Sequence, residues 1–284
     1  MAVKEKINNP GELTELRNIT VGSFLVRRFT ESTNPELVEV AQRIHAYDYL
    51  ISGYVSEDAI IDGKLRSEID TARGDTVTYY LGQECGDDDN KASTIRKKYI
   101  APDGSIEDLS AFGNSIGSLY AGEEDVLRSH ISKFGAQSVV EVGALARACG
   151  SKSSVSMKLI RTAVHDAVRE NPHERWMILF ADPAYRSMER FYGPTVARRI
   201  GHEAIVSSGK SYINDKLSFI PSVIEPANVL DTLAQEASSP DLDSRTRSKR
   251  LQAFKFMSEG AEDIVLGDRA QDLYEQVMAG EQSA

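Results

Sequence analysis

The spacing of apolar residues changes twice between residues 139 and 182, and this change predicts a strand, a helix and a second strand in succession. Val139–Arg147 is a compact apolar and β-branched run, typical of a buried strand. From Ser154 to Asn171 the apolar residues recur at helical spacing, and charged residues occupy the opposite face. Arg175–Asp182 is a second short apolar run. We therefore expect a β-turn-α-β unit at the centre of the fold.

Further elements are predicted on both sides of this unit. Apolar or β-branched runs indicate strands, and helical spacing indicates helices, at the following ranges: strands at 23–29, 76–81, 92–100, 195–205 and 212–224, and helices at 36–54, 184–192, 228–237, 244–258 and 268–278. Residues 104–135 are expected to form short helices or a variable insertion. The order of elements predicts a mixed α/β sheet. We divide the chain into a polar lead-in (1–22), a main α/β domain (23–225) and a helical C-terminal extension (226–284).

The turn at residues 148–153 is the first place where chemistry is expected. Gly150 allows a tight bend and the close approach of a ligand. The amides of 151–155 would point outward at the positive end of the helix dipole, which suits phosphate or pyrophosphate, and Lys152 would add a cation. The alternative is an ordinary capped loop. Neither GxGxxG nor GxxxxGK[ST] occurs, which argues against a Rossmann or Walker nucleotide site.

The composition and net charge of the chain argue against several classes of protein and site. The 284 residues carry a formal net charge of −10, and the pI is near 5.1, which argues against a general nucleic-acid binder but leaves a local basic pocket open. Cys85 and Cys149 are too few for a disulfide framework and lack metal-ligand spacing, so we expect a reducing, cytoplasmic setting. No apolar run reaches membrane-spanning length, and no signal segment is expected. The five histidines are scattered, so no metal site is predicted.

Several motifs resemble the GNAT-like acyltransferase superfamily, and within it the branch of acyl-homoserine-lactone synthases and N-acyl amino acid synthases. Val139–Arg147 is similar to the central strand of that family, and Arg147–Lys152 falls where the family carries its pyrophosphate loop. Asp182–Tyr192 resembles a family segment in which Asn-Pro precedes a helix ending in Phe-Tyr. Asp70 and Arg96 follow the order of an acidic residue and a strand arginine in the lactone-synthase branch.

Two departures from the family pattern affect the choice of donor. Lys152 stands where a small residue is expected, and the tryptophan expected in the first helix region is missing. The turn is also short. Acetyl-CoA, a longer acyl-CoA and an acyl carrier protein thioester therefore all stay open as donors, and so does the absence of any thioester.

The resemblance implies a GNAT-like fold with a C-terminal helical extension and assigns roles to individual residues. Acyl transfer from a thioester to an amine needs a base, and Glu141 on the central strand is the candidate. Its alternative role is a salt-bridged residue at the sheet surface. Tyr192 would protonate the departing thiolate, and its alternative role is a core aromatic beside Phe191.

Further residues would bind the two substrates. Backbone amides from Leu145 to Arg147 would hold the thioester, and the turn would receive pyrophosphate through its short run of small and basic residues, Gly150, Ser151, Lys152, Ser153 and Ser154. Arg96 would bind the carboxylate of an amino-acid acceptor, because a guanidinium fork suits a planar anion, and Asp70 would lie on the same acceptor side. The alternative for Arg96 is an exposed strand arginine.

Two functions, one of an enzyme and one of a non-catalytic protein, are consistent with these residues. The first is an N-acyltransferase that moves an acyl group from acyl-CoA or an acyl carrier protein to the amine of a small molecule or amino acid. The second is a non-catalytic GNAT-like scaffold used for binding or assembly. An acidic carrier protein would require a basic patch, which Lys152, Lys158 and Arg161 offer on one helix face. The C-terminal extension would pack on its own domain, the role we favour, or cap a homodimer or bind a partner.

Overall fold

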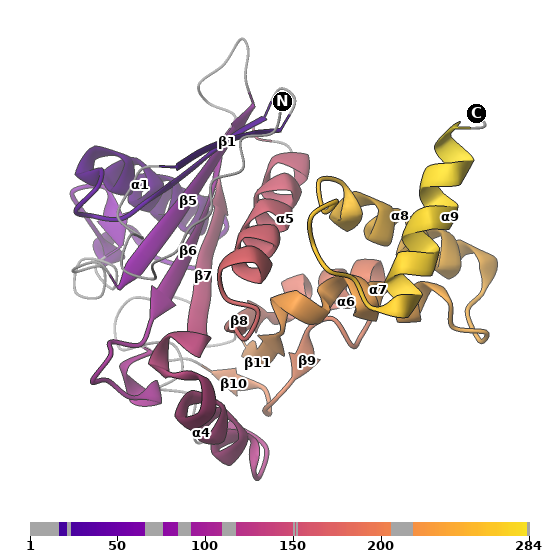
Figure 1. The fold of residues 1–284 in the computed structure, drawn as a ribbon. Helices are drawn as coiled ribbons and strands as arrows, with labels where there is room; N and C mark the ends of the chain where they lie inside the picture. The colour runs from indigo at the N-terminus through magenta and orange to yellow at the C-terminus, as the bar shows by residue number, and fades with distance from the viewer. Residues whose placement is uncertain are drawn as a thin grey trace. The chain divides into compact units, whose positions relative to one another are not determined.

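A computed structural model describes residues 17–21, 24–65, 76–84, 92–109, 118–149, 151, 153–205 and 218–282 (Figure 1). Strands and helices of the described chain belong to one mixed α/β architecture, which confirms the predicted fold class. The chain forms two compact units: the first holds Met1–Lys97 and Ala144–Leu159, and the second holds Lys98–Gly143 and Ile160–Ala284. Each unit is therefore described by itself.

The first unit is built on antiparallel strands. Its principal strands are, in sheet order, β1 (Arg17–Val21), β2 (Phe24–Phe29), β5 (Val77–Glu84) and β6 (Ala92–Tyr99, as far as Lys97), followed by the end of β7 (Val139–Arg147). β1 pairs with β2 and β2 with β5, for example Arg28 opposite Tyr80. A short hairpin of β3 (Ile60–Ile61) and β4 (Lys64–Leu65) follows the one-turn helix η1 (Glu57–Ala59).

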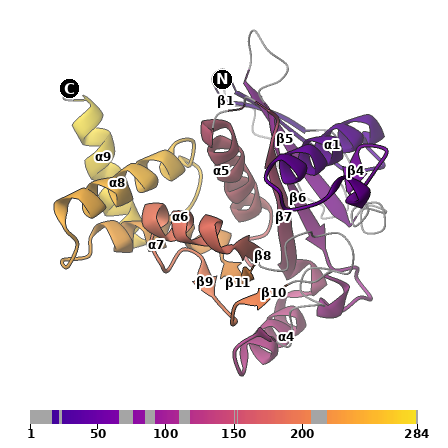
Figure 2. The ribbon, with the colours of Figure 1, turned by 180° about the vertical axis from the view of Figure 1, so that it is seen from behind.

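Helix α1 (Pro35–Ile51) covers one face of these strands (Figure 2). Its start is set by Asn34, whose Oδ1 accepts from the Leu37 amide at 3.0 Å, and by Pro35, which suits the first helical position. The apolar stripe of α1 packs on β2, β5 and β6 in one cluster of Phe29, Val38, Ala41, Val77, Tyr79, Leu81 and Ala92. On the opposite face, Gly82 lets Phe24 and Leu159 approach, since a Cβ there would lie 2.6 Å from the Phe24 ring.

The second unit contains the start of β7, then β8 (Arg175–Ala181), β11 (Ser218–Ile224) and β10 (Ala204–Ile205) in sheet order, with β9 (Arg198–Arg199) on β11. β7 and β8 are parallel, whereas β8 and β11 are antiparallel. Short elements precede β7: η2 (Ile106–Asp108), α4 (Glu123–Phe134) and η4 (Ala136–Ser138). They share one core with the strands, formed by Ile100, Ile106, Leu109, Leu127, Val139, Met177, Ile200 and Val223.

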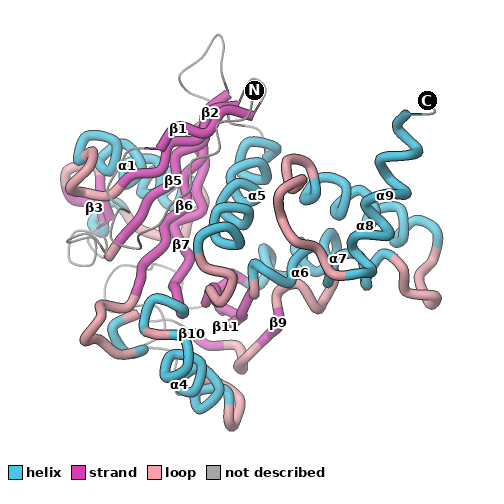
Figure 3. Tube along the Cα trace, viewed as in Figure 1, coloured by secondary structure: helices cyan, strands magenta, loops and turns pink. Residues whose placement is uncertain are grey.

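Helices complete the second unit. They are α5 (Ser153–Glu170, from Ile160 onward), α6 (Asp182–Tyr192), η5 (Pro226–Asn228), α7 (Val229–Ala237), α8 (Ser244–Ser258) and α9 (Asp268–Gln282). The last three α-helices pack on one another (Figure 3). The bounds predicted for β7 and α8 agree with the structure. β1 lies where no element was predicted. None of the described helices combines the length and apolar composition needed to cross a bilayer.

The charged face of α5 is covered by the C-terminal extension, which differs from the solvated face that helical periodicity predicts. Arg161 is only 3% exposed, and its guanidinium donates to the Phe256 carbonyl at 3.0 Å and pairs with Glu259. Arg169 pairs with Asp263 at 2.6 Å. Arg161 is therefore unavailable for the basic patch that an acidic carrier protein would need. The prediction failed because a long polar side chain is buried whenever another segment supplies its partners.

His165 also lies where α5 contacts the C-terminal extension, and it makes the stability of the folded chain depend on pH. Its Nε2 lies 2.7 Å from the Met257 carbonyl oxygen, and burial lowers the pKa of His165 to about 4 although this hydrogen bond and Asp263 oppose the shift. The unfolded chain has the ordinary histidine pKa near 6.5, so it binds more protons than the folded chain between pH 6.5 and 4. Stability is thus present above pH 6.5 and is lost as the pH falls toward 4.

We expect the free energy of unfolding, measured by urea titration, to fall by about 2 kcal/mol between pH 7 and pH 5 through His165 alone. His165→Gln keeps a donor for Met257 but does not titrate, so its stability should be flatter by that amount. The remaining slope includes His130, whose pKa is also lowered by burial. Equal slopes in the variant and the parent would contradict this assignment.

Candidate active site

Strand β7 is irregular near its end. Ala144 has a φ of +53°, a left-handed conformation that costs a non-glycine residue about 1 kcal/mol or more. Beyond it the strand alternates strictly: Ala144 and Ala146 are buried, whereas Leu145 is 41% exposed and Arg147 is exposed. A positive φ inside a strand is typical of a β-bulge, which re-aims side chains and interrupts pairing and is over-represented next to active sites.

The pairing of β7 with β8 also ends early. Both strands are described over their full length, yet their parallel register contains three pairs: Val139 with Arg175, Val140 with Trp176 and Glu141 with Met177. Within the second unit, the pairing therefore stops before Val142 and Gly143. Backbone groups that leave a ladder in this way are obligatory hydrogen-bonding groups that need another partner, and a ligand can supply one.

The turn after β7 is tied to β6 within the first unit. The Ala148 amide donates to the Ala92 carbonyl at 2.9 Å, and the Ser151 hydroxyl donates to the same oxygen at 3.0 Å. Ser93 Oγ donates to the Ala146 carbonyl at 2.8 Å and lies 2.9 Å from Ser156 Oγ on α5. The end of the strand and the start of the helix are thus held together by one buried serine pair.

The start of α5 is open to a ligand. Ser153 and Ser154 are exposed at the first two positions of the helix, where the amide groups have no carbonyl partners within the helix. These amides and the helix dipole favour an anion. Gly150 and Lys152, which the sequence also assigns to this turn, lie outside the described residues, as does Asp70.

The amide of Arg147 has a partner that the sequence did not suggest. It donates to Asp48 Oδ2 of α1 at 3.1 Å. This amide was expected to contribute to thioester binding, together with Leu145. In the structure the Asp48 carboxylate accepts from this amide. The carboxylate fixes the end of β7 to α1.

Glu141 and Tyr192 both belong to the second unit. Glu141 is only 3% exposed, and its strand neighbours in register are the buried Met177 and, beyond that, Val223. It is therefore a buried carboxylate in an apolar row and does not lie at the sheet surface. Tyr192 ends α6 and contacts Phe191 edge to face, with ring centres 5.0 Å apart. Burial raises the pKa of Tyr192, so its phenol keeps its proton at neutral pH.

Arg96 is half-buried on β6 of the first unit. Because side chains alternate along a strand, it shares the α1 face with Ala92. The next residue, Lys97, points to the other face and is 1% exposed, with its Nζ 5.7 Å from the centre of the Tyr80 ring. Arg28 lies at the same distance over that ring. The two buried cations Arg28 and Lys97 were not predicted from the sequence. The alternation of side chains around Arg96 nevertheless places Lys97 on the same face of β6 as the buried Ser93.

 An apolar cavity adjoins the turn within the first unit. Its volume is about 660 Å³. Residues of α1, of the β3–β4 hairpin and of the turn line it: Arg43, Ile44, Ala46, Tyr47, Leu50, Ile60, Asp62, Gly63, Ala148 and Cys149. The turn that follows β7 therefore has a largely apolar space beside it. Among the described residues, no group of three or more His, Cys, Asp or Glu side chains is placed to hold a metal ion.

The predicted site residues fall into two groups. Leu145, Arg147, Ser151, Ser153 and Ser154 lie in the first unit, from the end of β7 through the turn to the start of α5, and Arg96 belongs to the same unit. Glu141 and Tyr192 lie in the second unit. Their assignment to one active site remains a prediction from the sequence.

No family model matches the chain, and no curated protein matches its sequence. Among solved structures, FeeM, an N-acyl amino acid synthase from uncultured soil microbes, is 13% identical over 74% of this chain and 94% of its own, with a TM-score of 0.48. MesI, a CoA-dependent acyl-homoserine lactone synthase, is 9% identical over 81% and 95%, with a TM-score of 0.46. A ribosomal-protein-S5-alanine acetyltransferase from Vibrio fischeri is 9% identical over 74% and 97%, with a TM-score of 0.41.

At these identities and TM-scores, no residue role is transferred from those proteins to this chain.

Proposed function

We propose that this protein is an N-acyltransferase that moves an acyl group from a thioester to the amine of a small molecule or an amino acid. The observation that carries the proposal is the end of β7. The strand is distorted at Ala144, its pairing with β8 stops at Glu141, and a hydrogen-bonded turn connects it to the exposed start of α5. Such a strand offers backbone groups to a ligand along its length and an anion site at its end.

The donor that fits this arrangement is an acyl-CoA, with acetyl-CoA as its shortest form. The pyrophosphate of CoA would accept from the first amides of α5 at Ser153 and Ser154, where the helix dipole adds a positive potential. An acyl carrier protein is the weaker candidate, because Arg161 of the expected basic patch is buried against Phe256 and Glu259.

The reaction needs three events at the thioester carbon. Glu141 would accept a proton from the amine, directly or through a water, so that the nitrogen lone pair attacks the carbonyl carbon. The new C–N bond forms and the C–S bond breaks as the tetrahedral intermediate collapses. Tyr192 would donate its phenolic proton to the departing thiolate, which releases free CoA, and the proton on Glu141 returns to Tyr192 through solvent.

The acceptor is proposed from Arg96 and the cavity beside the turn. A half-buried guanidinium on β6 suits the carboxylate of an amino acid, because its donors match both carboxylate oxygens. The largely apolar cavity of α1, Ala148 and Cys149 suits an apolar part of a substrate. Asp70 stays a candidate for the acceptor side on the sequence alone.

The test places a negative charge at the start of α5. Ser154→Glu is expected to weaken the binding of acetyl-CoA and of a long-chain acyl-CoA roughly 10- to 100-fold in calorimetry, because like charges repel at short range. The same glutamate should leave the fold intact or stabilise it by about 0.3–1 kcal/mol, since it complements the helix dipole. Loss of binding with retained stability is thus the expected combination.

The matched control is Ser244→Glu, which adds the same side chain at the first position of α8. It should bind both acyl-CoAs as the parent does. If neither acyl-CoA binds the parent protein, the CoA-dependent function is wrong. If Ser154→Glu and Ser244→Glu bind equally well, the pyrophosphate site lies elsewhere.

A further inference from the structure

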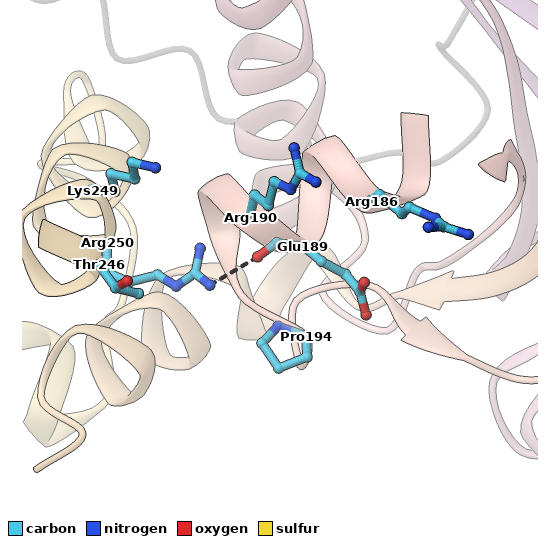
Figure 4. Close-up of a pocket in the computed structure, with 7 residues that line it drawn as sticks. All are labelled: Arg186, Glu189, Arg190, Pro194, Thr246, Lys249 and Arg250. Atoms are coloured by element: carbon cyan, nitrogen blue, oxygen red, sulfur yellow. Dashed lines mark hydrogen bonds between the residues drawn. The ribbon is translucent and has the colours of Figure 1, made fainter. Parts of the chain in front are cut away.

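A second cavity lies within the second unit, between α6 and α8, and its lining is strongly basic (Figure 4). Its volume is about 440 Å³. Four of its seven lining residues are basic and one is acidic: Arg186, Glu189, Arg190, Pro194, Thr246, Lys249 and Arg250. The protein as a whole carries a net charge of −10, so this concentration of positive charge runs against the composition of the chain.

The two helices present matching stripes to the cavity. On α6 the lining residues Arg186, Glu189 and Arg190 are spaced at i, i+3 and i+4, and on α8 Thr246, Lys249 and Arg250 follow the same spacing. Residues at this spacing lie on one side of a helix. The cavity is therefore bordered by one polar side of α6 and one polar side of α8.

Arg250 is the decisive residue. It is only 5% exposed, and its Nη2 donates to the Glu189 carbonyl at 2.8 Å (Figure 4). Its Nε and Nη1 have no hydrogen-bond partner among the described residues. The nearest carboxylate, Glu236, lies 3.8 Å from Nε, longer than a charge-assisted hydrogen bond of about 2.7–2.9 Å. A buried guanidinium donor without a hydrogen-bond partner costs free energy, so a ligand oxygen that accepts from Arg250 would be bound favourably.

The acidic groups around the cavity already have partners of their own, and one of these partners, Arg186, lines the cavity. Glu236 accepts from the Thr195 amide at 3.3 Å and from its hydroxyl, and Asp182 pairs with Arg186 at 2.9 Å. Glu189 faces Tyr185, whose pKa is raised to about 12 by burial first and by this carboxylate second. Arg190 and Lys249 form no ion pair with the described residues. The positive charge of the cavity is thus only partly compensated.

We propose that the cavity between α6 and α8 binds a small molecule that presents at least two negative charges, either on one phosphate group or on two carboxylates. Arg250 supplies buried donors, and Arg190 and Lys249 supply charge from the two helices. The volume of about 440 Å³ accommodates a small metabolite rather than a bare ion. The proposal does not depend on the acyltransferase function.

The test measures binding of inorganic phosphate and of malonate to the full chain by calorimetry, without acyl-CoA and at constant ionic strength. We expect saturable binding of at least one probe, and about tenfold weaker binding in each of the variants Arg190→Ala and Lys249→Ala, since one charge-assisted contact is lost. The matched control is Arg245→Ala, an exposed arginine of α8 that does not line the cavity. It should bind as the parent does.

The probe that binds identifies the ligand class: phosphate alone indicates a phosphate ester, and malonate alone indicates a dicarboxylate. Arg250→Lys keeps the charge but loses the guanidinium fork, and its thermal unfolding reports whether the contact with α6 survives. Weaker binding by a variant that still unfolds like the parent supports the role of Arg250. Absence of saturable binding of both probes, or equal binding by the cavity variants and Arg245→Ala, overturns the proposal.

Discussion

Replacing Glu141 by glutamine should lower kcat by roughly 10²- to 10⁴-fold while the KM for acyl-CoA changes little, because a general base contributes about that much to a proton transfer. Glutamine has the size of glutamate but cannot accept the proton of the amine. Glu141 is buried, and it pairs in register with Met177 of β8. This is the last residue pair between the two strands. Glu141 is the base that we propose for the attacking amine.

The control for this variant is Glu174→Gln. Glu174 is also a buried carboxylate of the second unit, and it accepts from the Trp176 indole, a bond that glutamine can still accept. Its kcat should stay within about twofold of the parent, since no proton transfer is assigned to it. Rates are compared in single-turnover reactions with circular dichroism as a check of the fold. If both variants lose the same activity, Glu141 acts through stability and is not the base.

Replacing Tyr192 by phenylalanine is expected to lower kcat by about 10²-fold, in the lower part of the range for general acid–base catalysis. The thiolate then leaves without a proton from the enzyme. Burial raises the pKa of Tyr192, so the phenol keeps its proton throughout the neutral range and beyond the ordinary tyrosine value of 10. The parent rate should therefore show no loss that is assignable to this tyrosine as the pH rises from 7 to 10.

Tyr185→Phe is the matched control on the same helix. Its hydroxyl donates to the Ala197 carbonyl at 3.4 Å, and no catalytic role is assigned to it. We expect a small loss of stability, about 1 kcal/mol or less for so long a hydrogen bond, and an unchanged kcat. A thiol reagent that reports free CoA measures both rates. If Tyr192→Phe retains the parent rate, the proton reaches sulfur from another donor.

Local pattern was enough to place the elements of the central unit. β7 is bounded by its apolar run, and α5 by its helical spacing, because each periodicity depends only on neighbouring residues. The turn between them was predicted for the same reason. Ser153 and Ser154 are exposed at the end of the turn where α5 begins, and they stand where the spacing of apolar residues changes to that of a helix.

The bulge in β7 was not predicted. Gly143 would be the natural residue for a left-handed conformation, yet the structure places it at Ala144. The choice between neighbouring residues is made by packing, since Ala144 and Ala146 must both turn inward while Leu145 turns outward. Such a choice depends on the other strands and has no local signal.

By itself the sequence determined the kinds and order of most elements from β7 to α9 and the position of the turn, because these depend on short-range spacing, whereas β1 and the β3–β4 hairpin were not predicted. Only the tertiary structure decided which polar residues are buried. Arg161 and His165 are covered by the end of α8 and the residue that follows it, and Arg250 donates to α6, so their environments are made by residues distant in the chain. Burial of a charge is possible only where such distant partners satisfy it, and that pairing is a property of the folded chain.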